Sequence, residues 1–215
     1  MSKFFTYTTS MKSSVFTHYS LPITHYPLVG IDEAGRGPLA GPVTVSAVAF
    51  LKPFDHTVLS EANDSKKLSP KKREKVRNVI EQLSEEGFIS FSIQSTDALF
   101  IDTHGIVPAI RDALSRALSQ LSLKPEEAHI QLDGSLKAPP EYIHQETIIR
   151  GDATHLAIML ASIMAKTERD REMIIHGARY PEYGFEVHKG YGTKRHYEAI
   201  KKNGLCALHR TTFIT

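Results

Sequence analysis

The chain has 215 residues, of which 41% are hydrophobic and 23% are charged, as is typical of a globular protein with a sizeable core. These values exclude a mostly disordered chain and a collagen-like chain. No stretch approaches the roughly 18 consecutive apolar residues of a membrane span, and the single cysteine, Cys206, excludes an internal disulfide framework and a cysteine-based zinc cluster. Because no apolar signal segment follows Lys3 either, we expect a cytoplasmic protein without a membrane contact.

Charged residues are unevenly distributed, although the formal net charge is only +2. Residues 166–215 hold 10 Lys and Arg against 6 Asp and Glu, whereas residues 1–165 hold 16 against 18. A second basic run lies within residues 66–77, where Glu74 is the only acid. A polyanion such as nucleic acid would explain two basic regions, but charge alone favours the alternative, a helix face exposed to water.

Residues 1–27 are rich in Ser, Thr, Tyr and His and lack hydrophobic periodicity, so we expect a poorly ordered extension there. From residue 28 onward, strand and helix patterns alternate. The predicted strands are residues 28–33, 43–50, 88–94, 129–132 and 142–149. The predicted helices are residues 70–83, 108–121, 154–176 and 193–202. This succession predicts an α/β fold with one central mixed β-sheet, since the first two strands follow one another as in a hairpin.

Two of the predicted helices carry clear local signals. Ser69 and Pro70 are typical of an N-cap followed by the first helical residue. The first half of helix 154–176 is apolar on all sides, which predicts that it is deeply buried.

Four acidic residues stand where a predicted strand ends or a buried helix begins. Asp32 and Glu33 end the first strand, Asp133 precedes Gly134, and Asp152 comes shortly before the long helix. Ends of neighbouring strands meet at one edge of an α/β sheet, where ligand sites usually form. Clustered carboxylates repel one another and have raised pKa values unless cations neutralise them. Mg²⁺ or Mn²⁺ are suitable cations, and two such ions about 4 Å apart would hold a phosphodiester for attack by water.

Other interpretations of these acids remain open. An Asp before Gly is commonly a turn residue, and an Asp before a helix is commonly an N-cap. Asp32 and Glu33 are adjacent, and adjacent strand residues point to opposite faces. Both reach one site only if the strand has begun to turn there, or if one of them acts through its backbone carbonyl.

The Gly- and Pro-rich turn at residues 35–42 superficially resembles a phosphate-binding loop. A P-loop or a dinucleotide fingerprint requires a helix after its glycines, whereas a β-branched strand follows here. The turn is therefore interpreted as a place where glycine lets the backbone approach a ligand, with Arg36 able to contact phosphate.

Residues 29–43, VGIDEAGRGPLAGPV, resemble the signature of ribonuclease HII, the type 2 ribonuclease H family. Six further segments match that family in order and spacing: 63–68 (NDSKKL), 132–134 (LDG), 151–152 (GD), 161–170 (ASIMAKTERD), 183–185 (YGF) and 188–193 (HKGYGT). The resemblance extends from about residue 28 to residue 213. The related type 3 enzymes lack the Gly-Arg-Gly, so the chain resembles type 2.

The resemblance implies a ribonuclease H-like fold with a mixed sheet and a small C-terminal helical part. It implies a catalytic domain (28–180) and a C-terminal helical substrate-binding segment (181–215), whereas the flexible extension (1–27) is expected from composition and has no counterpart in the family. The implied enzyme is a monomeric, metal-dependent endoribonuclease of ribonucleotide excision repair, with two Mg²⁺ or Mn²⁺ ions. It hydrolyses the RNA strand of RNA–DNA hybrids and incises 5′ of single ribonucleotides in duplex DNA, leaving 3′-OH and 5′-phosphate ends. The alternatives are a non-catalytic nucleic-acid-binding module and another two-metal nuclease.

The resemblance also assigns residues. It places metal binding and catalysis at Asp32, Glu33, Asp133 and Asp152. The implied substrate-binding residues are Gly35, Arg36, Gly37, Lys66, Lys67, Ser162, Lys166 and Tyr191. Met159-Leu160 replaces the Ser-Ala that many family members have, and Gly192 replaces a common Pro. His188, His196 and His209 are not expected to bind metal, because Mg²⁺ prefers oxygen.

Overall fold

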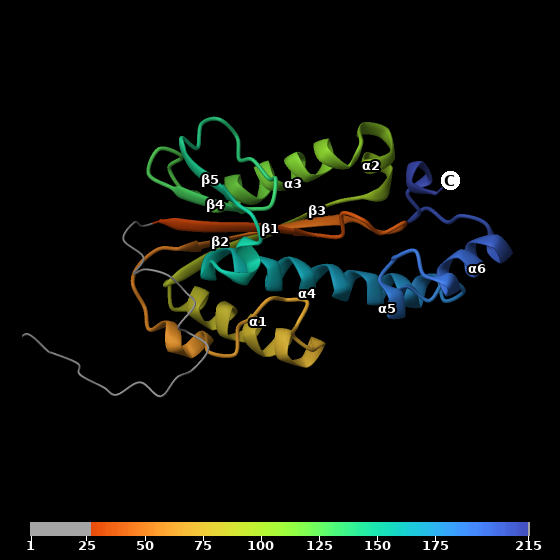
Figure 1. Ribbon diagram of the computed structural model, residues 1–215, viewed down its shortest axis with the longest axis horizontal. Helices are drawn as coiled ribbons and strands as arrows, with labels where there is room; N and C mark the ends of the chain where they lie inside the picture. Colours follow the sequence, from red (N-terminus) through yellow and green to blue (C-terminus); the bar gives the residue numbers. More distant parts are fainter. Residues whose placement is uncertain (1–26, 215) are drawn as a thin grey trace, which may run out of the picture.

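The computed structural model describes residues 27–214, so the predicted extension lies outside the described residues except for Pro27. A five-stranded sheet with the order β3-β2-β1-β4-β5 forms the centre of the molecule (Figure 1). Its strands are β1 (Leu28–Ala34), β2 (Val43–Phe50), β3 (Ile89–Thr96), β4 (His129–Asp133) and β5 (His144–Ile148). β1, β2 and β3 pair antiparallel, whereas β4 and β5 run parallel to β1. The predicted mixed sheet is confirmed.

Helices cover both faces of the sheet. They are α1 (Pro70–Glu85), α2 (Ala98–His104), α3 (Ile106–Gln120), α4 (Leu156–Arg179), α5 (Phe185–His188) and α6 (Lys194–Asn203). α1 and α4 lie on one face, and α2 and α3 lie on the other (Figure 1). Two hydrophobic cores result, one between each helical layer and the sheet. All eight residues of β2 are buried because both layers cover it.

α4 lies directly against the backbone of β1. The apolar half of α4 is buried as predicted, and Met159 and Leu160 belong to the core between α4 and α1. At Gly30, a Cβ atom would lie 2.0 Å from the carbonyl carbon of Ala157. The missing side chain at this one position therefore sets how closely the helix approaches the strand.

Several predicted boundaries were wrong. α2 was not predicted, because a helix of seven residues is too short to show a periodic pattern. Asp97 begins it by accepting a hydrogen bond from the Phe100 N–H, and Gly105, with φ of 89°, separates it from α3. β5 begins at His144 rather than at residue 142, and its side chains are mostly exposed because it is an edge strand.

Beyond the sheet, the second half of α4 packs with the C-terminal helices. Met173 of α4, Tyr183, Phe185 and Ala40 form a third, smaller core at the blue end of the molecule (Figure 1). Ala40 comes from the turn between β1 and β2, so this core joins the C-terminal part to that turn. None of the helices within residues 27–214 is both long and apolar enough to cross a membrane.

Candidate active site

Three of the four predicted acids lie near the carboxyl ends of β1, β4 and β5, which form the parallel half of the sheet. The last paired residues of β1 and β4 are Ile31 and Leu132, and Asp32 and Asp133 come directly after them. Asp152 lies in a short 3₁₀ turn after β5, and its backbone N–H donates to Asp133 Oδ1 at 3.4 Å. The convergence that the sequence predicted at this edge is confirmed.

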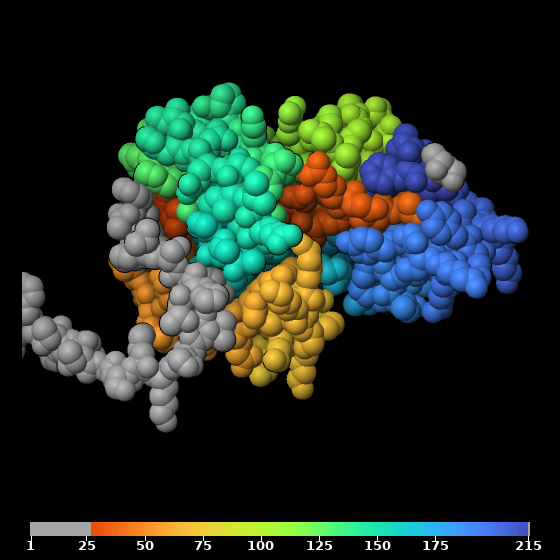
Figure 2. All heavy atoms as spheres, viewed as in Figure 1, coloured from red at the N-terminus to blue at the C-terminus, as the bar shows by residue number. Residues whose placement is uncertain are grey.

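A pocket of about 480 Å³ opens beside these strand ends. Most of the predicted site residues line it: Asp32, Glu33, Gly35, Arg36, Gly37, Lys66, Asp133, Ser162, Lys166 and Tyr191. In Figure 2 the orange turn between β1 and β2 lies at the surface where the teal, yellow and blue segments meet. The pocket therefore combines residues from β1 and the turn after it, from β4, from the α1 and α4 side of the sheet and from the C-terminal part.

Two predicted residues do not line the pocket. Asp152 lies next to it, with its Oδ2 atom 3.6 Å from the Nζ of Lys66. Lys67 turns toward Asp64, with 3.7 Å between Nζ and Oδ2.

Glu33 and Asp32 both line the pocket although their side chains alternate along a strand. Of the two predicted ways for both residues to reach one site, a turn of the strand does not apply, because the pairing of β1 with β2 continues to Ala34. The pairing of β1 with β4 stops at Ile31, so the last residues of β1 have a free edge on that side. Side chains from either face can reach around this edge into one pocket.

Burial and mutual repulsion raise the pKa values of three carboxyls. Burial is the main cause at Asp32, and the nearby charges of Glu33 and Asp133 add to it. Burial also raises the pKa of Glu33, which Arg36 partly offsets. At Asp133 the charge of Asp152 adds to the effect of burial. The site thus holds more negative charge than its neighbouring side chains neutralise.

These acids offer the oxygen ligands that Mg²⁺ and Mn²⁺ prefer. Within residues 27–214, no three His, Cys, Asp or Glu side chains are arranged as a preformed metal site. Partial burial alone would lower the pKa of Lys66. The charges of Asp152, Asp32 and Asp64 together raise this pKa by more, so the net shift is upward. The donor chemistry and the raised carboxyl pKa values fit divalent cations.

Ser162 of α4 contacts the most buried acid. Its hydroxyl lies 2.8 Å from that of Ser65, and a hydrogen bond from Ser162 lowers the otherwise raised pKa of Asp32. The close approach of α4 to β1 places this serine beside the strand end.

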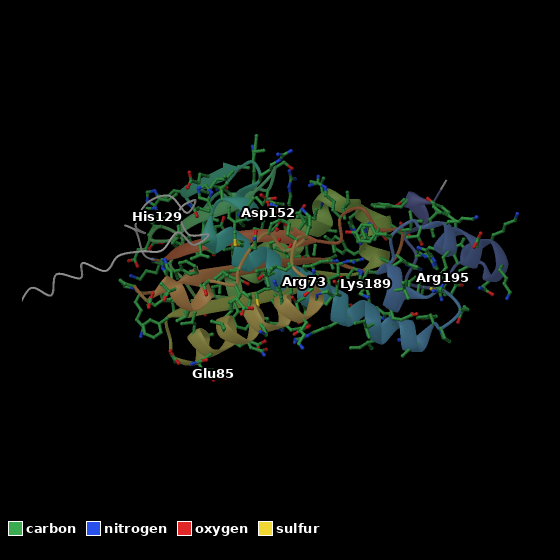
Figure 3. All side chains as sticks on the ribbon, turned by 60° about the horizontal axis from the view of Figure 1, so that its bottom comes forward. Arg73, Glu85, His129, Asp152, Lys189 and Arg195 are labelled. Atoms are coloured by element: carbon green, nitrogen blue, oxygen red, sulfur yellow. The ribbon has the colours of Figure 1, made fainter. Side chains whose placement is uncertain are left out.

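Arg73 belongs to the pocket wall and Asp170 pairs with two of its cations, although the sequence predicted neither residue to lie there. Arg73 lines the pocket and donates to the Ser65 and Leu68 carbonyls at 3.0 and 2.7 Å. Asp170 accepts from Arg73 at 3.2 Å and from Lys166 at 2.7 Å. Figure 3 shows Arg73 and Lys189 near the middle of the molecule, with Asp152 above Arg73. The available signals were the basic run and the Lys166–Asp170 spacing of one helical turn.

Tyr191 presents a half-exposed ring to the pocket. Lys166 Nζ and the Arg169 guanidinium each lie 6.0 Å from the centre of this ring. The backbone of Tyr191 is held on both sides, because its N–H donates to the His188 carbonyl at 3.0 Å and its carbonyl contacts His196 Nδ1 at 2.9 Å.

Gly35 and Gly37 differ in what surrounds them. Gly35 has φ of 91°, and a Cβ there would lie 2.0 Å from the Nε of Arg169. A Cβ at Gly37 would meet no atom within 4 Å. The protein interior therefore requires the first glycine, whereas the space above the second is open to a ligand.

Two fully buried arginines hold the turn that contains these glycines. Arg169 of α4 donates to the carbonyls of Pro42, Ala40 and Lys189 at 2.9 to 3.2 Å. Arg210 donates to three other carbonyls of the turn, those of Gly41, Arg36 and Gly35, at 2.7 to 3.0 Å. Burial lowers the pKa of Arg210 to about 9. No sequence signal identifies Arg210, because arginine is typical of an exposed surface.

The histidines of the C-terminal part lie in its small core. The rings of His188 and His196 stack at 4.4 Å, and His196 Nε2 is 3.2 Å from His209 Nε2. Burial lowers the pKa of His196 to about 4, so its ring is neutral at physiological pH. These rings form part of the packing that supports Tyr191.

Comparison with known proteins gives a consistent result. The family model described as Ribonuclease HII matches residues 29–215. Ribonuclease HII of Endomicrobium trichonymphae is 46% identical over 188 residues, which are 87% of this chain and 85% of the relative.

Solved structures share the fold. Ribonuclease H2 from Pyrococcus horikoshii OT3 has a TM-score of 0.67 and 25% identity, covering 86% of this chain and 92% of that one. Bst-RNase HIII in complex with Mn²⁺ has a TM-score of 0.68 and 17% identity, covering 87% and 67%. The fold is therefore the ribonuclease H fold, and the match of the family model over nearly the whole described chain shows that this protein belongs to the ribonuclease HII family and is a type 2 ribonuclease H enzyme.

Proposed function

We propose that this protein hydrolyses the RNA strand of RNA–DNA hybrids and incises duplex DNA 5′ of a single embedded ribonucleotide. The products carry a 3′-OH and a 5′-phosphate. The main support is one pocket that brings Asp32, Glu33 and Asp133 together with the Gly35–Gly37 turn and Tyr191. Acids alone would fit many two-metal nucleases, whereas a glycine turn and an exposed aromatic ring suit recognition of a sugar.

In this mechanism Asp32, Glu33, Asp133 and Asp152 would hold two divalent ions, Mg²⁺ or Mn²⁺. When bound, such ions supply a water of lowered pKa and stabilise charge on the leaving 3′ oxygen. Ser162 keeps Asp32 oriented through its hydrogen bond. The pairing of Lys66 with Asp152 balances part of the acidic charge before substrate arrives.

Recognition of the ribonucleotide depends on the backbone near the two glycines. A 2′-hydroxyl both donates and accepts hydrogen bonds, and this distinguishes RNA from DNA. The open space at Gly37 lets a sugar approach the main chain. Arg36, half-exposed beside Glu33 at 3.4 Å, can contact the adjoining phosphate.

The remaining proposals concern the whole protein. Residues 28–180 would form the catalytic domain, and residues 181–215 would contribute substrate contacts in addition to Tyr191. The flexibility of residues 1–27, the monomeric state and the cytoplasmic location remain predictions. Another two-metal nuclease remains the second candidate.

The direct test is incubation of the protein with an end-labelled DNA duplex that contains one ribonucleotide, with Mg²⁺ or Mn²⁺. We expect a single cut 5′ of the ribonucleotide and no cut in an all-DNA duplex. Cleavage of the all-DNA duplex or of branched DNA at a similar rate would favour the second candidate.

Tyr191→Ala is expected to impair incision at a lone ribonucleotide more than cleavage of a continuous hybrid. An aromatic ring stacked on the following deoxyribose contributes on the order of 1–3 kcal/mol, and only the lone ribonucleotide always has that sugar. The measurement is the ratio of kcat/KM on the two substrates at one salt concentration, since phosphate contacts depend on salt.

Tyr197→Ala is the matched control, because Tyr197 is equally exposed but does not line the pocket. An equal loss on both substrates would make Tyr191 a general packing residue.

Lys66→Ala is expected to lower kcat/KM roughly tenfold, about 1.4 kcal/mol, whereas Lys67→Ala is expected to stay within about twofold. Lys66 lines the pocket beside Asp152, while Lys67 pairs with Asp64 outside it. Steady-state kinetics of the two variants test this directly. Equal losses would show that both lysines contact substrate.

A further inference from the structure

A second, smaller pocket of about 180 Å³ adjoins the candidate active site. Its lining residues come from the Gly-Arg-Gly turn, from α3 and from the loop after β4: Arg36, Val107, Ile110, Arg111, Leu114, Ser135, Leu136 and Lys137. Arg36 lines both pockets, so the two are adjacent. Ser135 lies only two residues beyond Asp133, so the smaller pocket lies on the α3 side of the acids.

The chemistry of this pocket is that of an anion site. Three of its residues, Arg36, Arg111 and Lys137, are cationic, and none is acidic. Ser135 adds a hydroxyl donor. The floor is apolar, because Ile110 and Leu114 of α3 and Leu136 are buried. Cations around an apolar floor suit a phosphate with an attached sugar.

The cations of the two pocket walls differ in their partners. On the α4 side, Lys66 pairs with Asp152, and Lys166 and Arg73 both pair with Asp170. On the α3 side, Arg36 pairs with Glu33. Among the ion pairs of residues 27–214, none includes Arg111 or Lys137. The protein therefore neutralises its own cations on one wall and leaves two available on the other.

We propose that the pocket formed by Arg36, Arg111 and Lys137 binds one backbone phosphate of the duplex, next to the nucleotide that the active site holds. This inference rests on the proposed function, since it assumes that a duplex occupies the larger pocket. The nucleic-acid strand would extend from the acids past Arg36 and place one of its phosphates between Arg111 and Lys137. The contact fixes the register of the duplex but carries no sequence information.

The test measures binding and not cleavage, in the Asp32→Asn background and without divalent metal. The ligand is a DNA duplex with one ribonucleotide, in which single phosphates are replaced in turn by uncharged methylphosphonates. We expect one position near the ribonucleotide where this replacement weakens binding about tenfold when Arg111 and Lys137 are present. In the Arg111→Gln/Lys137→Gln variant, the same replacement should have no effect.

Salt dependence gives a second measurement. The logarithm of the binding constant falls with the logarithm of salt concentration by about 0.9 for each phosphate that is neutralised. The Arg111→Gln/Lys137→Gln variant should therefore lose about one unit of this slope. Lys52→Gln/Lys124→Gln removes the same charge at the end of the sheet opposite the active site, where Lys52 follows β2 and Lys124 precedes β4. This control variant should leave the slope unchanged.

The outcomes separate this inference from the proposed function. If no phosphate position loses its effect in the Arg111→Gln/Lys137→Gln variant, the phosphate site is wrong. The inference is also overturned if inorganic phosphate binds at this pocket while every methylphosphonate duplex behaves alike. Failure of the wild-type protein to incise at a ribonucleotide, with the binding pattern intact, would overturn the proposed function alone.

Discussion

Asp133→Asn, Asp32→Asn and Asp152→Asn are each expected to reduce kcat/KM by roughly 10³-fold or more, the scale for losing a group that stabilises the transition state. Asparagine keeps the shape of the side chain but removes the charge that would hold a divalent ion. The measurement is cleavage of the single-ribonucleotide duplex at saturating Mg²⁺. Glu85→Gln is the control, because Glu85 is exposed at the outer edge of the molecule (Figure 3).

Asp32→Asn should show a second effect that simple misfolding would not produce. Burial and the charges of Glu33 and Asp133 raise the pKa of Asp32 in the folded protein. The folded chain therefore holds this proton more tightly than the unfolded chain. The resulting stability is present below the unfolded pKa and is lost as the pH rises through the raised folded pKa.

Asp32→Asn is accordingly expected to raise the Tm of the metal-free protein at neutral pH, with a smaller gain at pH 4. Thermal unfolding with a chelator present tests this. A lower Tm at neutral pH would show that the charge on Asp32 stabilises the fold, and near-normal turnover would remove Asp32 from the proposed metal ligands.

Gly30→Ala is expected to reduce the free energy of unfolding by about 3 kcal/mol or more, at the upper end for overpacking. The new Cβ would lie 2.0 to 2.3 Å from three backbone atoms of Ala157 and Ile158. Backbone cannot rotate aside as a side chain can, so α4 would have to move away from β1. That movement would also displace Ser162 from Asp32.

Chemical denaturation of Gly30→Ala and Gly37→Ala gives the matched comparison. A Cβ at Gly37 meets nothing, so Gly37→Ala should keep wild-type stability. Its activity should fall, because the methyl group occupies the space proposed for the ribose. Equal stability of Gly30→Ala and wild type would mean that α4 can shift freely on the sheet.

The sequence was most informative where one residue's neighbours along the chain determine its environment. The apolar run at 43–50 matches β2 at both ends, and Ser69 caps α1 as predicted. The convergence of Asp32 and Asp133 followed from strand order, because both residues come directly after the last paired residues of the parallel strands β1 and β4. The position of Glu33 was harder to predict, since its access to the pocket depends on where the pairing between β1 and β4 stops.

Contacts between distant parts of the chain could not be predicted in this way. Arg169 and Arg210 look like surface charges in the sequence, yet both are fully buried and bonded to carbonyls far away in the chain. Lys66 and Lys67 are adjacent and chemically identical, and only the path of the loop decides which one faces Asp152.

The bonds of Arg210 also affect the order in which the protein can be assembled during synthesis. The ribosome makes the Gly35–Pro42 turn first. The Arg210 guanidinium, which donates hydrogen bonds to the carbonyls of this turn, is added about 170 residues later. The backbone of Leu208 and Arg210 adds bonds to Gly41 and Leu39. A nascent chain that has not reached residue 208 holds all four carboxylates while the turn lacks this support. The sugar-reading part of the pocket therefore takes its final shape only after the acidic part, once Arg210 has been added to the chain.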